Sequence, residues 1–284
     1  TAGGVSDTTS VQFLPGPEAV LSITAVPNNL TANGASQSTV SVMVTDAQGN
    51  AVADGKTLSF TVSTGSGTLS APTASTTNGK ATVTYTASNT VGTETITAQA
   101  ANGVSTTVDI TLIAASVADV TINSGANSLV ADGQSQAQIT ASITDQSTNS
   151  ISDGTQVTFS TTAGDIDATQ NGMQTSFTTT TVNGQATAIL TSPTNVGSAD
   201  ITATAGGFSE TINLTFISGA PASLTVNADP ASLTADGNST STISAMVLDA
   251  NNNPVQDGQT LKFSALHGQL DSLTQTTSGG TASV

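Results

Sequence analysis

Residues 31–60 read TANGASQSTVSVMVTDAQGNAVADGKTLSF. Apolar side chains occupy every second position of residues 40–44 and again of residues 58–62, with Ser, Thr or Met between them. Strict alternation of this kind is typical of an antiparallel strand with one buried face. The Asn-Gly and Asp-Gly pairs that flank the two runs are residues that tight turns favour. The stretch therefore predicts an all-β fold.

The same pattern recurs twice more. The turn sequence at Thr31–Gly34 returns 99 residues later at Val130–Gly133, and a further 104 residues later at Thr234–Gly237. Several such strands in about 100 residues predict a two-sheet sandwich for each copy. Residues that keep both intervals include Asp46, Asp145 and Asp249, the Asp-Gly pairs at 54–55, 153–154 and 257–258, and the alternating apolar runs Ile139-Ala141-Ile143, Val157-Phe159, Ile243-Ala245-Val247 and Leu261-Phe263-Ala265.

Matches at the two ends set the predicted domain boundaries. Thr1–Ser6 resembles Thr204–Ser209, and Gly279–Val284 resembles Asn78–Val83. Because the chain starts at Thr1 without a signal-like segment, we expect a piece of a longer polypeptide. The predicted parts are the last strand of a preceding repeat (1–14), two full repeats (15–114 and 115–218) and a third repeat that stops before its final strands (219–284).

The charge balance argues against several classes of partner. The net charge is −16, with 19 acidic residues against three lysines. Nucleic-acid binding needs Lys and Arg to displace phosphate counterions, and anionic lipid surfaces attract the same side chains. We therefore expect no nucleic-acid partner and no membrane insertion by this segment, the latter also because no apolar run reaches 18 residues. The absence of cysteine excludes disulfides, thiolate nucleophiles and Cys-ligated metal sites.

The combined motifs resemble a known family. An Ala-Asn/Asp-Gly turn, an alternating strand, an Asp-Gly-x-x-Leu/Val-x-Phe strand and an Asn-Gly-x-Ala strand are similar to the group 1 bacterial immunoglobulin-like repeat of intimin- and invasin-type adhesins. The resemblance covers residues 17–284 almost continuously. It implies tandem immunoglobulin-like β-sandwich domains arranged head to tail as a rod, an extracellular location on the bacterial surface, and anchorage elsewhere in the polypeptide, in the outer membrane or as a secreted protein. The short linkers between copies are consistent with a rod.

Few residues suggest chemistry, and we expect no enzyme, no catalytic residue and no cofactor. His267 is the only histidine, and its counterparts Ala163 and Ser66 cannot act as bases, which favours a surface loop. Asp165 and Asp167 alternate on one predicted strand face and are the candidate calcium ligands. Because the other copies carry Thr, Ser or Gln at most of these positions, a solvated strand face is favoured over an ion site.

Two loops superficially resemble calcium-binding loops. Asp46–Asn50 and Asp249–Asn253 contain one carboxylate each, whereas calcium needs six to eight oxygen ligands. Asx-type turns, in which Asp accepts backbone hydrogen bonds, explain them better. Calcium at a domain junction, bound by Asp54, Asp119 or Asp229, stays an alternative. The second copy also has about eight extra residues within Ala168–Val182, for which tolerated length variation is favoured over a binding loop.

Three functional hypotheses remain. The leading one is a stalk or spacer of a bacterial surface adhesin that projects a distal domain in cell adhesion. The alternatives are a structural subunit of a surface layer, filament or phage tail, and a carbohydrate-binding accessory module of a secreted enzyme. The expected partners are neighbouring Ig-like repeats of the same chain, while a host-cell, surface or glycan ligand binds through another domain. Lateral self-association through exposed edge strands is a further expectation to be tested.

Overall fold

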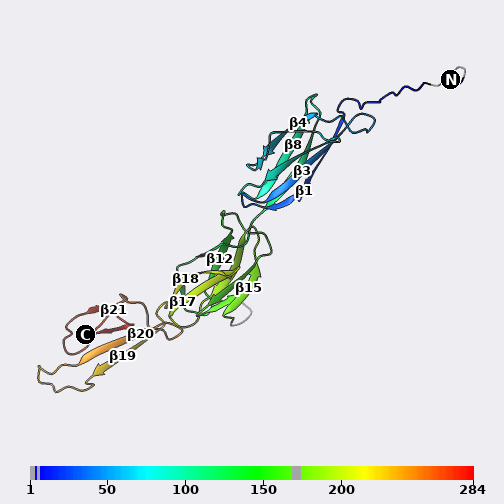
Figure 1. Ribbon diagram of the computed structural model, residues 1–284. Coiled ribbons are helices and arrows are strands. Elements are labelled where there is room, and N and C mark those ends of the chain that lie inside the picture. The colour runs from blue at the N-terminus through cyan, green and yellow to red at the C-terminus, as the bar shows by residue number, and fades with distance from the viewer. Residues whose placement is uncertain (1–3, 5–6, 168–173) are drawn as a thin grey trace. The chain divides into compact units, whose positions relative to one another are not determined.

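The computed structural model describes residue 4 and residues 7–167 and 174–284, and all regular structure within them is β-strand (Figure 1). The described residues contain no helix suited to crossing a membrane. The chain separates into two compact units, Thr1–Ser116 with Thr144–Ile151, and Val117–Ile143 with Ser152–Val284. The predicted all-β fold is confirmed. Because residues 168–173 lie outside the described residues, the extra segment of the second copy is covered only in part.

The first sandwich has a four-stranded sheet in the order β1-β3-β7-β5 and a five-stranded sheet in the order β2-β9-β8-β4-β6. Strand β2 runs parallel to β9, and the other pairings within the sandwich are antiparallel. Its strands are β1 (Val20–Val26), β2 (Asn29–Thr31), β3 (Gln37–Thr45), β4 (Thr57–Thr64), β5 (Thr68–Leu69), β6 (Thr73–Ser75), β7 (Lys80–Thr86), β8 (Gly92–Ala100) and β9 (Ser105–Ile113).

The second sandwich repeats this topology strand for strand. Its sheets have the orders β10-β12-β16-β14 and β11-β18-β17-β13-β15, and β11 runs parallel to β18 as β2 does to β9. Its strands are β10 (Asp119–Ser124), β11 (Ser128–Val130), β12 (Gln136–Thr144), β13 (Gln156–Thr161), β14 (Asp165–Asp167), β15 (Ser176–Thr180), β16 (Gln185–Thr191), β17 (Gly197–Ala205) and β18 (Phe208–Ile217).

The third repeat has a three-stranded sheet, β19-β20-β23, and a separate hairpin, β21-β22. The prediction of one strand through Leu261, Phe263 and Ala265 is wrong beyond Lys262, where β21 ends. The counterparts β4 and β13 each pair with a long strand, β8 or β17, whereas among the described residues β21 pairs with β22 alone. The strands are β19 (Ser223–Asp229), β20 (Thr242–Leu248), β21 (Thr260–Lys262), β22 (Thr274–Thr276) and β23 (Thr281–Ser283).

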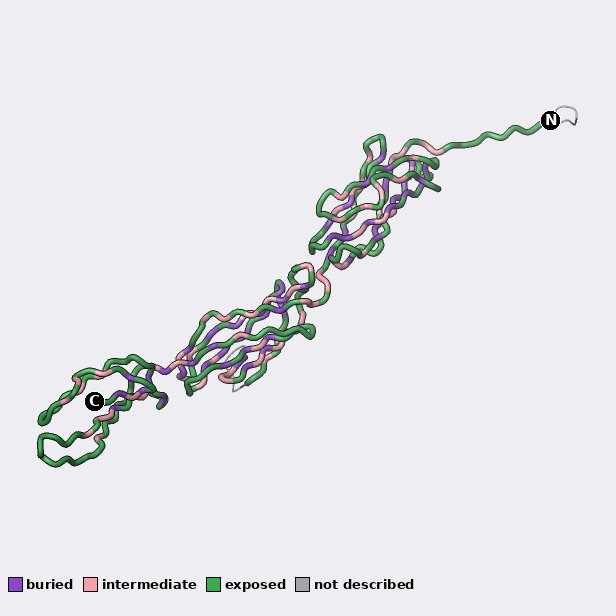
Figure 2. Tube along the Cα trace, turned by 60° about the vertical axis from the view of Figure 1, so that its left-hand side comes forward, coloured by how far each residue is buried: buried purple, intermediate pink, exposed green. Residues whose placement is uncertain are grey.

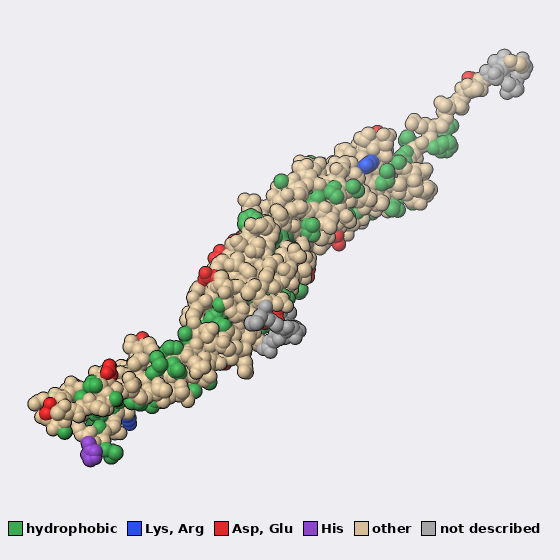
Figure 3. All heavy atoms as spheres, turned by 90° about the horizontal axis from the view of Figure 1, so that it is seen from below, with side chains coloured by type: hydrophobic (Ala, Val, Ile, Leu, Met, Phe, Trp, Pro, Cys, Tyr) green, Lys and Arg blue, Asp and Glu red, His purple; other side chains and the backbone are tan. Residues whose placement is uncertain are grey.

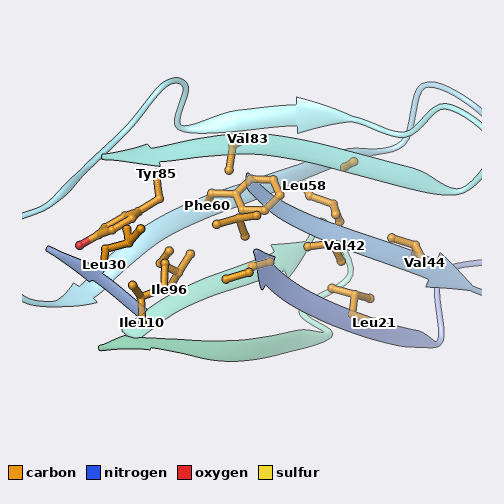
Figure 4. Close-up of a cluster of buried hydrophobic side chains, with 14 of the residues drawn as sticks. Leu21, Leu30, Val42, Val44, Leu58, Phe60, Val83, Tyr85, Ile96 and Ile110 are labelled. Atoms are coloured by element: carbon orange, nitrogen blue, oxygen red, sulfur yellow. The ribbon is translucent and has the colours of Figure 1, made fainter. Parts of the chain in front are cut away.

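The alternating residues form the core, as their period predicts. Val40, Val42 and Val44 of β3 are each 0% exposed, and buried and exposed positions alternate along the strands (Figure 2). Phe60 lies beside Leu58 and Val42 in the interior of the first sandwich (Figure 4). Val, Ile, Leu and Ala side chains therefore fill most of the space between the sheets, and the rings of Phe60 and Tyr85 complete it.

The Asp-Gly pair at residues 54–55 is hydrogen-bonded to the hairpin turn at Asn78-Gly79. Asn78 and Gly79 both have positive φ, 51° and 74°, which is the geometry of a two-residue type I′ hairpin. The Asp54 carboxylate accepts a hydrogen bond from the Asn78 N–H at 2.6 Å. The same contact recurs from Asp153 to Asn183 and from Asp257 to Gly279. This turn is therefore a shared part of all three repeats.

Replacing Phe60 by Ala should destabilise the first sandwich by about 3–5 kcal/mol, because the ring is 2% exposed and its loss leaves a cavity. The chain has one Tyr, Tyr85 in this core, and no Trp, so tyrosine fluorescence during urea unfolding reports on this sandwich alone. Met43→Ala is the control, since Met43 is 43% exposed on the opposite face of β3. Equal shifts for the two variants would contradict the assignment of Phe60 to the core.

Candidate functional site

Three aspartates stand directly after the second strand of each main sheet, at equivalent places. Asp46 follows β3, Asp145 follows β12 and Asp249 follows β20, and each is 2–3% exposed. One carboxylate oxygen, Oδ1 of Asp46, accepts hydrogen bonds from the backbone N–H groups of Gln48 at 3.0 Å and Asn50 at 2.9 Å. The corresponding bonds form in the other two loops. The predicted Asx-type turns are confirmed.

The other carboxylate oxygen binds the linker that leads into the repeat. Gly16 donates its N–H to Asp46 Oδ2 at 2.9 Å, Ala115 to Asp145 Oδ2 at 3.0 Å, and Gly219 to Asp249 Oδ2 at 2.9 Å. The donor lies 30 residues before the acceptor in all three cases. Sequence reasoning assigned Asp46 and Asp249 to local turns and missed the linker contact of all three aspartates, because the donors are backbone N–H groups and not a recurring residue type.

These hydrogen bonds keep the carboxylates charged. The N–H of Gly16, followed by the side chain of Asn50, lowers the pKa of Asp46 to about 2. For Asp145 and Asp249, burial acts to raise the pKa, but the side-chain amide of the loop Asn and the backbone donors outweigh it, so both pKa values lie below the usual range. The donors are neutral amides, and each loop is therefore organised around one negative charge.

Glu94 is a further buried carboxylate that sequence reasoning missed. It is 4% exposed and accepts hydrogen bonds from the Tyr85 hydroxyl at 2.7 Å and the Gly67 N–H at 2.9 Å. Burial opposes its charge, but hydrogen bonds from Ser88, Tyr85 and the backbone hold its pKa below the usual value, while burial raises the pKa of Tyr85. In the second repeat Leu190 and Ala199 take these places.

The candidate calcium ligands lie in β14. Asp165 is half-buried and accepts a hydrogen bond from the Gln174 N–H. Asp167 is 4% exposed and has a polar or electrostatic partner, so the favoured solvated strand face is wrong for this residue. The strand end turns inward at Asp167, next to the buried Ile166. Neither Asp165 nor Asp167 belongs to a metal-binding group of three or more His, Cys, Asp or Glu within the described part of the chain.

The remaining sequence candidates lie apart. His267 is exposed in a bend of the third repeat, outside any strand. Asp54 binds the hairpin turn of its own repeat, and Asp119 and Asp229 lie at the start of β10 and the end of β19. In the residues that the structure describes, these three aspartates form no metal-binding cluster. Calcium at a junction stays a prediction.

The surface offers shallow hollows. One lies on the outer face of β10, β12 and β16, lined by Thr and Gln side chains such as Thr121, Gln138 and Gln185. Its counterpart on the first sandwich is lined by Ser, Thr, Val26, Met43 and Lys80. Neither lining contains an aromatic ring, the kind of side chain that commonly lines small-molecule sites. The visible face likewise carries scattered acids and isolated lysines rather than a charged patch (Figure 3).

Sequence families match along almost the whole chain. The group 1 bacterial Ig-like domain matches residues 20–113, and invasin domain 3 matches residues 116–219 and 220–284. The fold and the repeated loops thus define a tandem array of bacterial Ig-like domains. The chain belongs to the invasin domain 3 family, whose model matches more than half of its length. These families are Ig-like domains of extracellular adhesins without enzymatic activity, so the chain is an extracellular protein segment and not an enzyme.

Solved structures of adhesins share the fold. The Escherichia coli adhesin FdeC is 21% identical, with a TM-score of 0.63 over 87% of this chain and 80% of that one. InvD of Yersinia pseudotuberculosis is also 21% identical, with a TM-score of 0.60 over 93% of this chain and 81% of that one. No curated protein sequence matches the chain. The predicted resemblance to the intimin and invasin group is confirmed.

The stability of the first sandwich should depend on pH through Asp46 and Glu94. Both folded-state pKa values are lowered, to about 2 for Asp46, so their stabilisation is complete above the unfolded-state value near 4 and is lost as the pH falls toward 2. Urea unfolding followed by Tyr85 fluorescence should show constant stability from pH 7 to 5 and a decline below pH 4.5. Asp46→Asn should lower stability at pH 7 and flatten the decline. An unchanged slope in this variant would contradict the role of Asp46.

Proposed function

We propose that this chain is a stalk segment of a long bacterial cell-surface adhesin, where it holds a distal binding domain away from the cell. The observation that carries the proposal is the repetition of one linker contact. Three Ig-like repeats of an adhesin family follow one another, and in each an Asp carboxylate binds the linker N–H at 2.9–3.0 Å. A linker that is held by this hydrogen bond joins two repeats without adding a flexible segment between them.

The surface supports a spacer rather than a binding module. The two hollows lack aromatic rings, and on the face seen in Figure 3 the acidic side chains are dispersed rather than gathered into one patch. A host-cell, surface or glycan ligand would then bind another domain of the same polypeptide, which is anchored to the outer membrane or secreted. The net charge of −16 also supports the absence of a nucleic-acid partner.

Deleting residues 115–218 from the full-length protein on its native cells tests the spacer role. Adhesion should fall because the distal domain loses reach, while surface display, measured with an antibody to the first repeat, should stay unchanged. Replacing the same residues with an unrelated Ig-like sandwich of equal length is the matched control and should restore adhesion. A spacer acts through length alone, so failure of this replacement would contradict the proposal.

The purified chain supplies a second readout. As a spacer it should show no saturable binding to host cells or to a glycan array. Binding by the chain alone would overturn the spacer role in favour of a binding module. Electron microscopy of cells that carry the native protein should show individual projections. A regular layer or filament would instead support the alternative, in which the chain is a structural subunit of such an assembly.

A further inference from the structure

The last residue of the Asp145–Asn149 loop and of the Asp249–Asn253 loop binds a turn that lies far earlier in the chain. In the second compact unit, Asn253 donates its side-chain N–H to the Thr194 carbonyl oxygen at 2.9 Å and accepts the Val196 N–H at 3.2 Å. In the first unit, Asn149 makes the same pair of contacts with the Asn89 carbonyl at 2.8 Å and the Val91 N–H at 3.2 Å. The side-chain amide of the Asn thus binds one carbonyl oxygen and one N–H that lie two residues apart in the turn. A neighbouring β-strand would bind the same two backbone groups.

The two turns are equivalent elements of successive repeats. Residues 89–91 connect β7 to β8, and residues 194–196 connect β16 to β17. The Asn of one repeat therefore binds the turn of the repeat before it. The loop Thr144–Ile151 even belongs to the compact unit of the first sandwich, although its flanking strands β12 and β13 belong to the second. Asn251 adds a hydrogen bond to the Ala131 carbonyl at 3.2 Å.

The Asp carboxylate orients this amide. The Asn253 side-chain N–H group that binds Thr194 also donates to Asp249 Oδ2 at 3.0 Å, and Asn149 donates to Asp145 Oδ2 at 3.0 Å. A carboxylate accepts hydrogen bonds but cannot donate them, so the NH2 group of the Asn side chain must face the Asp. The amide oxygen of the Asn is then free to accept the N–H of the turn. One charge thereby positions both the linker and the docking amide.

The first repeat has the same loop without an occupant among the described residues. Gly16 already donates to Asp46, and Asn50 donates to both Asp46 oxygens at 3.1 and 3.3 Å. Asn50 is exposed, whereas Asn253 is 5% exposed beneath its turn. Within the described residues no N–H donates to the side-chain oxygen of Asn50. The docking geometry is therefore formed before any turn binds.

We propose that the Asp-x-x-x-Asn loop is a docking surface for the turn between the seventh and eighth strands of another Ig-like repeat. Asn149 and Asn253 bind that turn within this chain, and Asn50 offers the same surface to the turn of a further repeat. We expect the partner to be an Ig-like repeat because the Asn amide binds a carbonyl and an N–H that lie two residues apart. The turn between the seventh and eighth strands of a repeat presents these two groups directly beside the bound linker. The inference does not depend on the adhesive role, since it concerns contacts between repeats only.

Backbone hydrogen exchange in the intact chain tests the two occupied loops. Asn149→Ala should speed exchange of the Val91 N–H by about two- to tenfold and leave Val196 unchanged, because one net hydrogen bond contributes about 0.5–1.5 kcal/mol. Asn253→Ala should do the reverse. Asn50→Ala is the matched control, since it removes an Asn from the equivalent loop of the first repeat and should affect neither N–H. Unchanged exchange of Val91 in Asn149→Ala, or an equal effect of Asn50→Ala, would overturn the proposal.

A longer chain tests the unoccupied loop. In this longer chain, a second copy of residues 117–217 replaces residues 1–14 and is joined directly to Pro15. The turn at residues 194–196 of the added copy then lies within reach of Asn50. The Val196 N–H of the added copy should be protected, and Asn50→Ala should remove that protection about two- to tenfold. The Tyr85 unfolding transition checks that the first sandwich remains folded. An unprotected Val196 in the added copy with Asn50 intact would show that this end is not a docking surface. Neither result depends on the adhesion assay.

Discussion

A buried carboxylate at the end of the second strand of each main sheet is the constraint from which the rest follows. An aspartate that is 2–3% exposed needs hydrogen-bond donors, and among the described residues no lysine forms a salt bridge with it. Its donors come from the loop, including the side chain of the loop Asn, and from the linker, which is otherwise a separate part of the chain. Satisfying one charge therefore determines the path of the backbone into and around each repeat.

In this protein backbone N–H groups, rather than lysine or arginine side chains, are the main partners of the buried carboxylates. With three lysines in 284 residues, ion pairs are scarce, and the one within the described residues joins Lys56 to Glu18 at 3.4 Å. Carboxylates instead bind N–H groups of turns, as Asp54 binds Asn78. Such hydrogen bonds to a charged acceptor are short and directional, and they stabilise loops at low side-chain entropy cost because one partner is the backbone. This pattern recurs in all three repeats.

Periodicity predicted the fold better than the site. The alternation at residues 40–44 correctly placed Val40, Val42 and Val44 in the core, because a strand with one buried face leaves that signature in the sequence. The same alternation through Glu94, Ile96 and Ala98 marked Glu94 as inward-facing, and this signal was overlooked. The linker bond of Asp46 joins residues 30 positions apart, which neither composition nor local spacing encodes. Asp167 is buried directly after the buried Ile166, which breaks the expected alternation.

The neutral character of these donors has a consequence for the environment in which the protein works. Dissolved salt screens the mutual repulsion of exposed acids within about 10 Å at 0.1 M and weakens exposed ion pairs. The Asp46 carboxylate, which is 3% exposed and is held by the N–H of Gly16, is largely shielded from this screening. A higher salt concentration should therefore weaken the electrostatic repulsion that comes with a net charge of −16, while the hydrogen bonds of the loops keep their strength. Such a protein can keep its loops folded in fluids of widely different ionic strength.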